Sequence, residues 1–309
     1  MERRKLGRTG LELSVLGYGA SPLGNSFGPI DVAEGRRSVH RAIDLGINLF
    51  DTSPYYGLTL SETVLGEALA GRRDEILLCS KVGRYGRDEF DFTPKSILPG
   101  LEASLKRLKT DHLDLVIAHD IEFAPLGPIL ADTIPALLKA KEQGKVRAVG
   151  VSGLPLVALH RAIDGASLDF VLSYCHYTLY DTTLSDELAR VAAERGIGLM
   201  NAAPLGMGLL TKGGPPDWHP APEALKLACT EAVALCDIRG ADISALALAF
   251  SVAAPFVAST IVGMPTVAEV EANVRAATTP VDPGLVAEVQ AILAPVSDMT
   301  WPSGLPENN

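Results

Sequence analysis

Short apolar runs alternate with longer amphipathic segments along nearly the whole chain. Runs of this kind, set between segments of helical periodicity, are typical of the buried strands of a parallel sheet. After a hairpin expected around Arg3–Leu13, we predict strands at Val15–Gly19, Ile47–Phe50, Ile76–Ser80, Leu113–Ala118, Arg147–Val151, Phe170–Leu172, Gly198–Asn201 and Ser259–Val262. The helical segments between them include Val32–Leu45, Ser61–Ala70, Thr93–Leu108, Ile129–Gln143 and Leu184–Arg195.

Eight strands, each followed by at least one helix, predict a (β/α)8 TIM barrel with an N-terminal β-hairpin. The alternative, an open doubly wound sheet, needs a glycine-rich phosphate loop after its first strand. The first strand here runs into GYGASPLGNSFG, which lacks the third glycine at the required spacing. We find no linker or repeat and expect residues 1–309 to form one barrel domain. Two long segments, Gly206–Ala221 and the tail after Pro295, are expected to help form or cover its site.

Composition narrows the class of protein. The formal net charge of −10 argues against binding to nucleic acid or to an anionic membrane surface, because both need basic clusters. The chain shows neither a secretory signal nor an apolar stretch long enough to span a bilayer. Its four cysteines are scattered without a CxxC pair, which predicts reduced thiols, with no zinc site and no disulfide. We therefore expect a cytoplasmic protein, either a monomer or a small homo-oligomer.

Three ionisable residues directly follow predicted strands. Asp51 follows Ile47–Phe50, Lys81 follows Ile76–Ser80, and His119 follows Leu113–Ala118; Tyr56 comes five residues after Asp51. Each residue alone has an ordinary structural interpretation, such as a helix cap, loop packing, a solvated strand end or a core histidine. Because the carboxyl ends of barrel strands meet at one mouth, we expect all four side chains to converge there.

A tyrosine next to a lysine and an aspartate suits proton transfer. The phenol has an ordinary pKa near 10, and a neighbouring ammonium group favours the phenolate and lowers that pKa. The aspartate would hold the lysine charged, and the histidine would orient a substrate oxygen or relay its proton. The residues around this group contain no metal-ligand pattern. The electrophile is therefore expected to be an organic cofactor, and nicotinamide fits the oxidation of an alcohol or the reduction of a carbonyl.

Four motifs occur in an order that resembles the aldo-keto reductase superfamily. They are FDTSPYYG, SETVLGEAL, SKVG and DLVIAHD, and the resemblance extends from KLGRTGLELSVLGYG to about Ala277. It implies a (β/α)8 barrel that binds NAD(P) without a Rossmann domain. It also implies a catalytic tetrad of Asp51, Tyr56, Lys81 and His119, with Tyr56 as the general acid or base.

The same resemblance implies where the nicotinamide and pyrophosphate lie. GVSG at 150–153 matches the family's GVSN, so Ser152 is expected to bond the carboxamide, and Gly153 replaces the usual Asn. Ser173 stands where the family usually has a Gln, and the aromatic that commonly stacks on nicotinamide falls near Ala202. The loop PLGMG is expected to cover the pyrophosphate with backbone N–H groups, through Pro204, Leu205, Gly206 and Met207.

The adenosine end of the cofactor is expected at TIVGMPTVAEVEANV. By resemblance, Asn273 contacts adenine and Gly263 stands where many members have Lys. Glu269 falls where NADP-dependent members commonly have Arg. A carboxylate there would accept hydrogen bonds from ribose hydroxyls and repel a 2′-phosphate, so we predict NAD in preference to NADP. The alternative is that Glu269 is only a solvated helix residue.

Two further segments suggest the substrate. GASPLGNSFGPI (19–30) and LSYCHYTLYD (172–181) resemble the branch of aldose 1-dehydrogenases that includes the L-galactose dehydrogenases. This implies NAD-dependent oxidation of L-galactose, L-fucose or a similar aldose at C1 to the lactone, with Tyr56 as base. Side chains expected to contact the sugar are Tyr55, Tyr85, Asp120, His176, Tyr177, Trp218 and Trp301. The alternatives are an NADPH-dependent aldehyde or ketone reductase and a non-catalytic NAD(P)-binding regulatory subunit.

Overall fold

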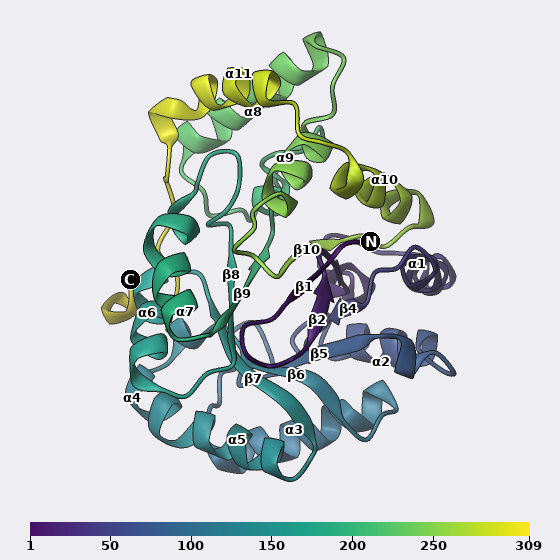
Figure 1. The fold of residues 1–309 in the computed structure, drawn as a ribbon, viewed down its shortest axis with the longest axis vertical. Coiled ribbons are helices and arrows are strands. Elements are labelled where there is room, and N and C mark those ends of the chain that lie inside the picture. Colours follow the sequence, from purple (N-terminus) through teal and green to yellow (C-terminus); the bar gives the residue numbers. More distant parts are fainter.

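Eight parallel strands close into a barrel in the computed structural model, which describes residues 1–309 (Figure 1). Each strand pairs with the next along the chain, and the last closes the barrel by pairing Thr260 with Leu16. The strands are β3 (Leu16–Gly19), β4 (Leu49–Asp51), β5 (Leu77–Val82), β6 (Leu113–Ala118), β7 (Val146–Gly153), β8 (Phe170–Tyr174), β9 (Gly198–Ala202) and β10 (Ser259–Gly263). The predicted barrel is confirmed, with each predicted strand shifted by a few residues at most.

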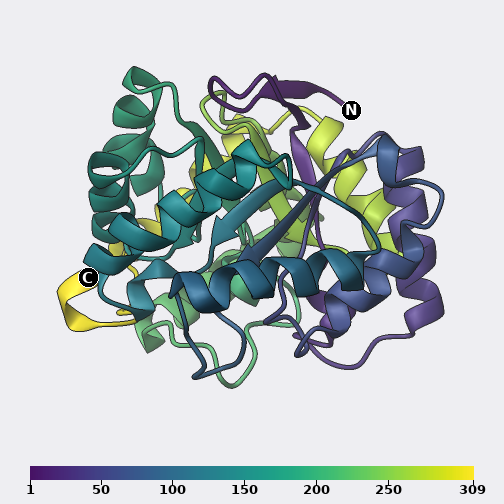
Figure 2. The ribbon, with the colours of Figure 1, turned by 90° about the horizontal axis from the view of Figure 1, so that it is seen from below.

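The predicted N-terminal hairpin is also present. It consists of β1 (Arg3–Lys5) and β2 (Glu12–Ser14), paired antiparallel. Its apolar side chains Leu6, Leu11 and Leu13 are buried and join the cluster inside the barrel. Figure 2 shows the hairpin at one end of the barrel, with the long loops at the opposite end. The hairpin therefore plugs the amino-terminal end of the strands, which leaves the carboxyl end for chemistry.

Helices surround the barrel. They are α1 (Val32–Asp44), α2 (Leu60–Ala68), α3 (Pro94–Leu108), α4 (Leu126–Pro128), α5 (Ile134–Glu142), α6 (Leu156–Gly165), α7 (Arg190–Glu194), α9 (Ile243–Val252) and α10 (Val267–Thr278). Two further helices, α8 (Glu223–Ile238) and α11 (Pro283–Leu293), pack against each other outside this ring, at the top of Figure 1. None of the helices is long and apolar enough to cross a membrane.

Two of the predicted helices are not α-helical throughout. Ile129–Thr133 and Leu184–Ala189 are π-helical turns that lead into α5 and α7. The apolar periodicity that predicted both helices continues across these turns, so it does not distinguish the wider turn from the α-helix. The four cysteines are all free and buried. Cys229 and Cys236, seven residues apart, both lie on the buried face of α8.

The C-terminal segment returns to the catalytic end of the barrel and binds to Glu122, just after β6. Leu305 N donates to the Glu122 carbonyl at 2.8 Å, and Ser303 Oγ donates to its carboxyl Oε1 at 3.0 Å. Asn308 Nδ2 donates to the Glu122 and Ala124 carbonyls, both at 3.0 Å. Gly304 has φ +72°, and a Cβ there would lie 2.3 Å from the Glu122 carbonyl oxygen. Only glycine permits this close approach.

The side chain of Glu122 is a buried carboxyl group. Its Oε1 also accepts a hydrogen bond from Leu154 N at 3.2 Å, whereas its Oε2 has no partner. Burial and the neighbouring carboxylate of Asp120 raise the pKa of Glu122 to about 7. The protonated form of Glu122 is therefore favoured in the folded protein over a range in which an unfolded glutamate is ionised.

We predict that Glu122→Gln flattens the dependence of stability on pH. An acid whose folded pKa is raised stabilises the fold fully below its unfolded pKa, and this contribution disappears as pH rises through the folded pKa. Between about pH 5 and pH 8, wild type should lose about 2 kcal/mol of unfolding free energy relative to the variant. Urea unfolding of both proteins across this range measures the difference, and parallel curves would contradict the assignment.

Candidate active site

A buried ion pair joins two neighbouring strand ends. Lys81, on β5, places its Nζ 2.5 Å from Asp51 Oδ1 and 2.7 Å from the carbonyl oxygen of Thr52. The exposed fractions of the two charged side chains are 1% and 5%. Burial opposes the charge of Lys81, but Asp51 and the neighbouring Tyr56 outweigh it and raise the lysine pKa. Lys81 is therefore an ammonium group, fixed by two hydrogen bonds.

Tyr56 is held against this pair by contact between two loops. Gly57 adopts φ +62°, and a Cβ there would lie 2.2 Å from the carbonyl oxygen of Gly24. The turn after β4 thus lies backbone to backbone on the segment after β3. Lys81 Nζ lies 4.9 Å from the centroid of the Tyr56 ring. The His119 ring meets the same ring at 90°, with the centroids 5.7 Å apart. The four predicted side chains are thus brought together.

The phenol of Tyr56 titrates differently from the expectation. Lys81 does lower its pKa, but burial has the larger effect, and Asp51 and Asp120 add to it. The net result is a pKa raised above its ordinary value. The expected lowering is therefore wrong in its net direction, because the sequence argument omitted the cost of burying a phenolate. In the protein alone Tyr56 is a neutral phenol at pH 7, which makes it a proton donor.

His119 is a neutral imidazole at the end of β6. Its Nδ1 lies 3.1 Å from Ser53 Oγ, and its Nε2 lies 3.6 Å from Asp120 Oδ2. Burial, followed by the cations Lys81 and Arg84, lowers the pKa of His119 well below its ordinary value. A neutral imidazole carries one N–H donor and one acceptor, so this side chain offers a single directed proton.

Arg84 and Asp120 form a second ion pair beside the histidine, with Arg84 Nη1 donating to Asp120 Oδ2. The guanidinium carbon lies 3.9 Å from the centroid of the Tyr55 ring and 5.1 Å from those of Phe90 and Phe123. Three aromatic rings therefore hold the arginine in place. Our sequence analysis did not single out Arg84. Its position three residues after Lys81, at the end of the same strand, could have indicated that it belongs to the site.

The predicted nicotinamide contacts lie on adjacent strands. Ser173 of β8 pairs in register with Gly153 of β7, next to Ser152. Ser173 Oγ is buried without a hydrogen-bond partner, whereas Ser152 Oγ accepts from Asp120 N at 3.1 Å. An orphaned buried hydroxyl calls for a polar ligand, because leaving it unpaired costs about 1 to 3 kcal/mol. This hydroxyl fits a carboxamide.

The structure gives a physical reason for one departure from the family pattern and shows the surroundings of another. A Cβ on Gly153 would meet Glu122 Oε2 at 2.8 Å, so the buried carboxyl occupies the space that a larger residue would need. Ala202, where an aromatic was expected, pairs in register with Tyr174 of β8. Tyr174 donates its hydroxyl hydrogen bond to Glu122 Oε1 at 3.3 Å. Tyr174 was not predicted as a site residue; it ends β8, two residues beyond the predicted strand Phe170–Leu172.

The predicted pyrophosphate loop follows β9. Pro204, Leu205, Gly206 and Met207 form a turn directly after Ala203, and Ala203, Gly206 and Met207 all have positive φ values, between 52° and 57°. His219 Nε2 lies 3.0 Å from the Gly206 carbonyl oxygen, which fastens the loop to the segment before α8. The turn is therefore a defined local structure.

At the predicted adenosine end, the first turn of α10 is closed by the chain's own acceptors. Thr266 and Glu269 form a capping box, in which Glu269 Oε2 accepts from Thr266 N at 3.0 Å. Glu34 Oε1, from α1, accepts from Val267 N at 2.9 Å. Glu269 is exposed, Asn273 is half-buried one turn later, and Gly263 ends β10. Glu269 therefore has a structural role in capping, in addition to any role toward a cofactor.

Of the predicted sugar contacts, Tyr55 and Asp120 lie with the tetrad, as described above. Three others make their contacts elsewhere. Tyr85 donates its hydroxyl hydrogen bond to the Ser96 carbonyl of α3 at 3.4 Å. Tyr177 stacks on Phe250 of α9 with a centroid separation of 5.3 Å. His176 Nδ1 lies 2.8 Å from Thr183 Oγ1.

The two tryptophans differ in exposure. Trp301 is buried, with its ring edge-on to His219 at 5.0 Å between centroids. Trp218 is 55% exposed, and its centroid lies 6.2 Å from that of Phe27 in the loop after β3. Of the two, Trp218 is therefore the one open to solvent, and Trp301 packs against His219.

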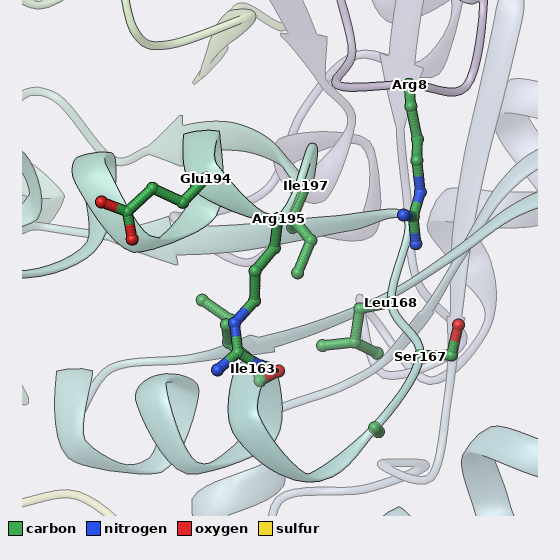
Figure 3. A pocket seen from close by; sticks show the side chains of 8 residues that line it. Arg8, Ile163, Ser167, Leu168, Glu194, Arg195 and Ile197 are labelled. Atoms are coloured by element: carbon green, nitrogen blue, oxygen red, sulfur yellow. Dashed lines mark hydrogen bonds between the residues drawn. The ribbon is translucent and has the colours of Figure 1, made fainter.

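A cavity of about 390 Å³ lies elsewhere, between α6, α7 and the hairpin (Figure 3). It is lined by Arg8, Ile163, Ala166, Ser167, Leu168, Glu194, Arg195 and Ile197. Arg8 belongs to the hairpin that plugs the amino-terminal end of the barrel, and none of the predicted site residues lines this cavity. This cavity therefore lies apart from the predicted site.

Comparisons with known proteins agree with this geometry. Residues 15–294 match the family model described as the aldo/keto reductase family. L-galactose dehydrogenase of Arabidopsis thaliana is 46% identical, with 100% of this chain and 99% of that protein covered. D-threo-aldose 1-dehydrogenase of a Pseudomonas species is 31% identical, with 91% and 94% covered.

A solved structure is also similar over its whole length. The holo form of the aldo-keto reductase AKR11C1 from Bacillus halodurans superimposes with a TM-score of 0.77 at 27% identity, and 98% of each chain is covered. Together with the buried tetrad at the carboxyl end of the barrel, these matches identify the chain as a member of the aldo/keto reductase family, whose oxidoreductases use a nicotinamide cofactor.

Proposed function

We propose that the protein oxidises an aldose at C1 to the lactone, with NAD as hydride acceptor. L-galactose, L-fucose or an aldose of similar configuration is the proposed substrate. The observation that carries this proposal is Tyr56 held between the Lys81 ammonium group and the neutral His119 at the barrel mouth. The aldose dehydrogenases among the relatives support the substrate class.

In the proposed reaction Tyr56 first loses its proton to water, and its phenolate then takes the proton of the C1 hydroxyl while the C1 hydrogen leaves as hydride. A bound oxidised nicotinamide would supply the hydride acceptor and a positive charge that favours the phenolate. Lys81 stabilises the phenolate from the side of the barrel, and Asp51 keeps Lys81 charged and in place. His119 donates to the C1 oxygen, on which negative charge develops as its proton leaves.

The residues around the mouth fit a sugar. Asp120 offers a carboxylate oxygen and Tyr55 an aromatic face, and both are fixed by Arg84. A carboxylate accepts hydrogen bonds from vicinal hydroxyls, while an aromatic ring packs on the apolar face of a pyranose. We propose Asp120, Tyr55 and the exposed Trp218 as sugar contacts.

Charge at the start of α10 supports NAD over NADP. Thr266 N, Val267 N and Glu269 N already donate to Glu269, Glu34 and Thr266 respectively. A 2′-phosphate placed there would meet the carboxylate of Glu269 and that of Glu34, which is paired with Arg37, and would find these three backbone donors occupied. A ribose hydroxyl, by contrast, can donate to the carboxylate of Glu269. We also propose that Asn273, which lies on the same helix, contacts the adenine of the cofactor.

One observation favours a second candidate function. The raised pKa of Tyr56 keeps it protonated in the protein alone, which suits proton donation to a carbonyl. An NADPH-dependent reductase of aldehydes or ketones would use this form of Tyr56 directly. The two carboxylates at α10 count against it, because they oppose the 2′-phosphate.

We predict NAD reduction with a subset of aldoses in a panel of L- and D-sugars, with L-galactose or L-fucose giving the highest kcat/KM. Absorbance of the reduced nicotinamide measures turnover, and aldehydes with NADPH form the second arm. Tyr56→Phe, which retains the ring and removes the hydroxyl, should lower kcat by at least about a hundredfold. Turnover only with NADPH and carbonyl substrates would overturn the proposal.

We predict that cofactor preference changes with the charge at α10. Glu269→Arg should raise the NADP/NAD ratio of kcat/KM about tenfold or more, through a new charge-assisted bond to the 2′-phosphate. Glu34→Gln keeps an acceptor for Val267 N but removes the charge, and it should raise the NADP/NAD ratio of kcat/KM about threefold. The matched control is Glu271→Gln, also on α10, where Glu271 pairs with Arg41 at 2.8 Å. Unchanged ratios in Glu269→Arg and Glu34→Gln would contradict the proposed preference for NAD.

A further inference from the structure

Ser53 lies two residues after Asp51 and contacts the catalytic histidine directly. Its Oγ is 3.1 Å from His119 Nδ1 and also accepts a hydrogen bond from Tyr55 N at 3.1 Å. Its side chain is completely buried, and it makes no other side-chain hydrogen bond. The resemblance to the aldo-keto reductases assigned this serine no role.

The hydrogen-bond inventory of the pair decides the direction of the bond. A hydroxyl has one proton to donate and two lone pairs. The Tyr55 backbone N–H occupies one lone pair of Ser53 Oγ, so the serine proton is free to point at Nδ1. Nδ1 then acts as the acceptor, and the single proton of the neutral imidazole lies on Nε2.

The opposite arrangement leaves a buried donor unsatisfied. If Nδ1 carried the proton, Ser53 Oγ would accept two N–H groups and its own proton would have no acceptor. Ser53 is 0% exposed, so water does not satisfy that proton. An unsatisfied buried donor shifts an equilibrium by roughly tenfold, which is enough to select one tautomer.

We propose that Ser53 is a positioning residue that holds the proton of His119 on Nε2, aimed at the C1 oxygen of the sugar. This inference rests on the proposed aldose oxidation only for the identity of that oxygen. Nε2 makes no hydrogen bond within the chain; Asp120 Oδ2, at 3.6 Å, is the nearby acceptor, and Arg84 already binds it. The Nε2 proton is thus available to a substrate.

The charges around His119 agree with this assignment. Lys81 and Arg84 are cations near the ring, and both oppose a second proton on it. Asp120 is the acidic group on the Nε2 side, and its carboxylate attracts the proton to that nitrogen. The aromatic rings of Tyr55 and Tyr56 face the imidazole ring. Ser53 supplies the remaining contact, at Nδ1.

The test compares Ser53→Ala with Ser53→Thr, which restores a hydroxyl. Nitrogen-15 NMR of histidine-labelled protein reports the tautomer without substrate or cofactor, and a His119→Asn spectrum assigns the signal. Ser61→Ala is the matched control, because it also removes a buried hydroxyl, one that bonds Thr52 and the Ala20 carbonyl. Thermal unfolding of every variant separates folding defects from the effect on His119.

Wild type should show Nδ1 unprotonated and Nε2 protonated, and Ser53→Ala should show a mixture of tautomers. kcat should fall about fivefold to tenfold in Ser53→Ala with little change in KM, because the bond from Nε2 strengthens as charge develops. Ser53→Thr should restore both the wild-type tautomer and the wild-type kcat. Ser61→Ala should keep the wild-type tautomer. An Nδ1–H tautomer in wild type, or an unchanged tautomer in Ser53→Ala, overturns the inference. Failure to oxidise any aldose would instead contradict the proposed function, because the NMR result does not depend on turnover.

Discussion

The buried ion pair between Lys81 and Asp51 is the interaction on which the site depends. Removing two charges from water is expensive, and their attraction compensates only when the geometry is good and further hydrogen bonds are made. Here the pair is 2.5 Å apart and the ammonium group also donates to the Thr52 carbonyl. The closed barrel makes this possible, because β4 and β5 are neighbours whose ends meet in register, with Asp51 opposite Cys79. The fold thus provides a fixed positive charge where water is excluded.

Burial then determines the protonation state of the other groups. It keeps Tyr56 a phenol, although the cation Lys81 favours the phenolate. It also keeps His119 a neutral imidazole, and there the cations Lys81 and Arg84 act in the same direction as burial. A base for alcohol oxidation therefore has to lose its own proton before the substrate hydroxyl gives up its proton, and Lys81 is already in position to stabilise the resulting phenolate. The hydrogen bond from Ser53 completes the arrangement, since it directs the one histidine proton toward the reacting oxygen.

The sequence predicted the barrel and the convergence of Asp51, Tyr56, Lys81 and His119 for a physical reason: buried parallel strands are short apolar runs, and the polar residues that follow them share one mouth. It failed where the outcome depends on side-chain direction or on contacts between distant segments. Tyr85 follows a strand end, yet its hydroxyl turns outward to α3. The tie between Glu122 and the C-terminal segment joins residues nearly two hundred positions apart, and no local pattern reports it. The effect of burial on Tyr56 likewise becomes visible only in three dimensions.

The most direct test of the ion pair's role is the pH dependence of single-turnover NAD reduction in wild type and in the double variant Asp51→Asn/Lys81→Met. The double change avoids leaving one buried charge unpaired, which would itself destabilise the fold. In wild type the rate should rise with pH over about pH 6 to 9 as Tyr56 becomes able to accept a proton. In the variant the same rise should move to higher pH by at least about one unit, because the phenolate has lost its neighbouring cation. A profile that stays in place would contradict the claim that this pair tunes Tyr56.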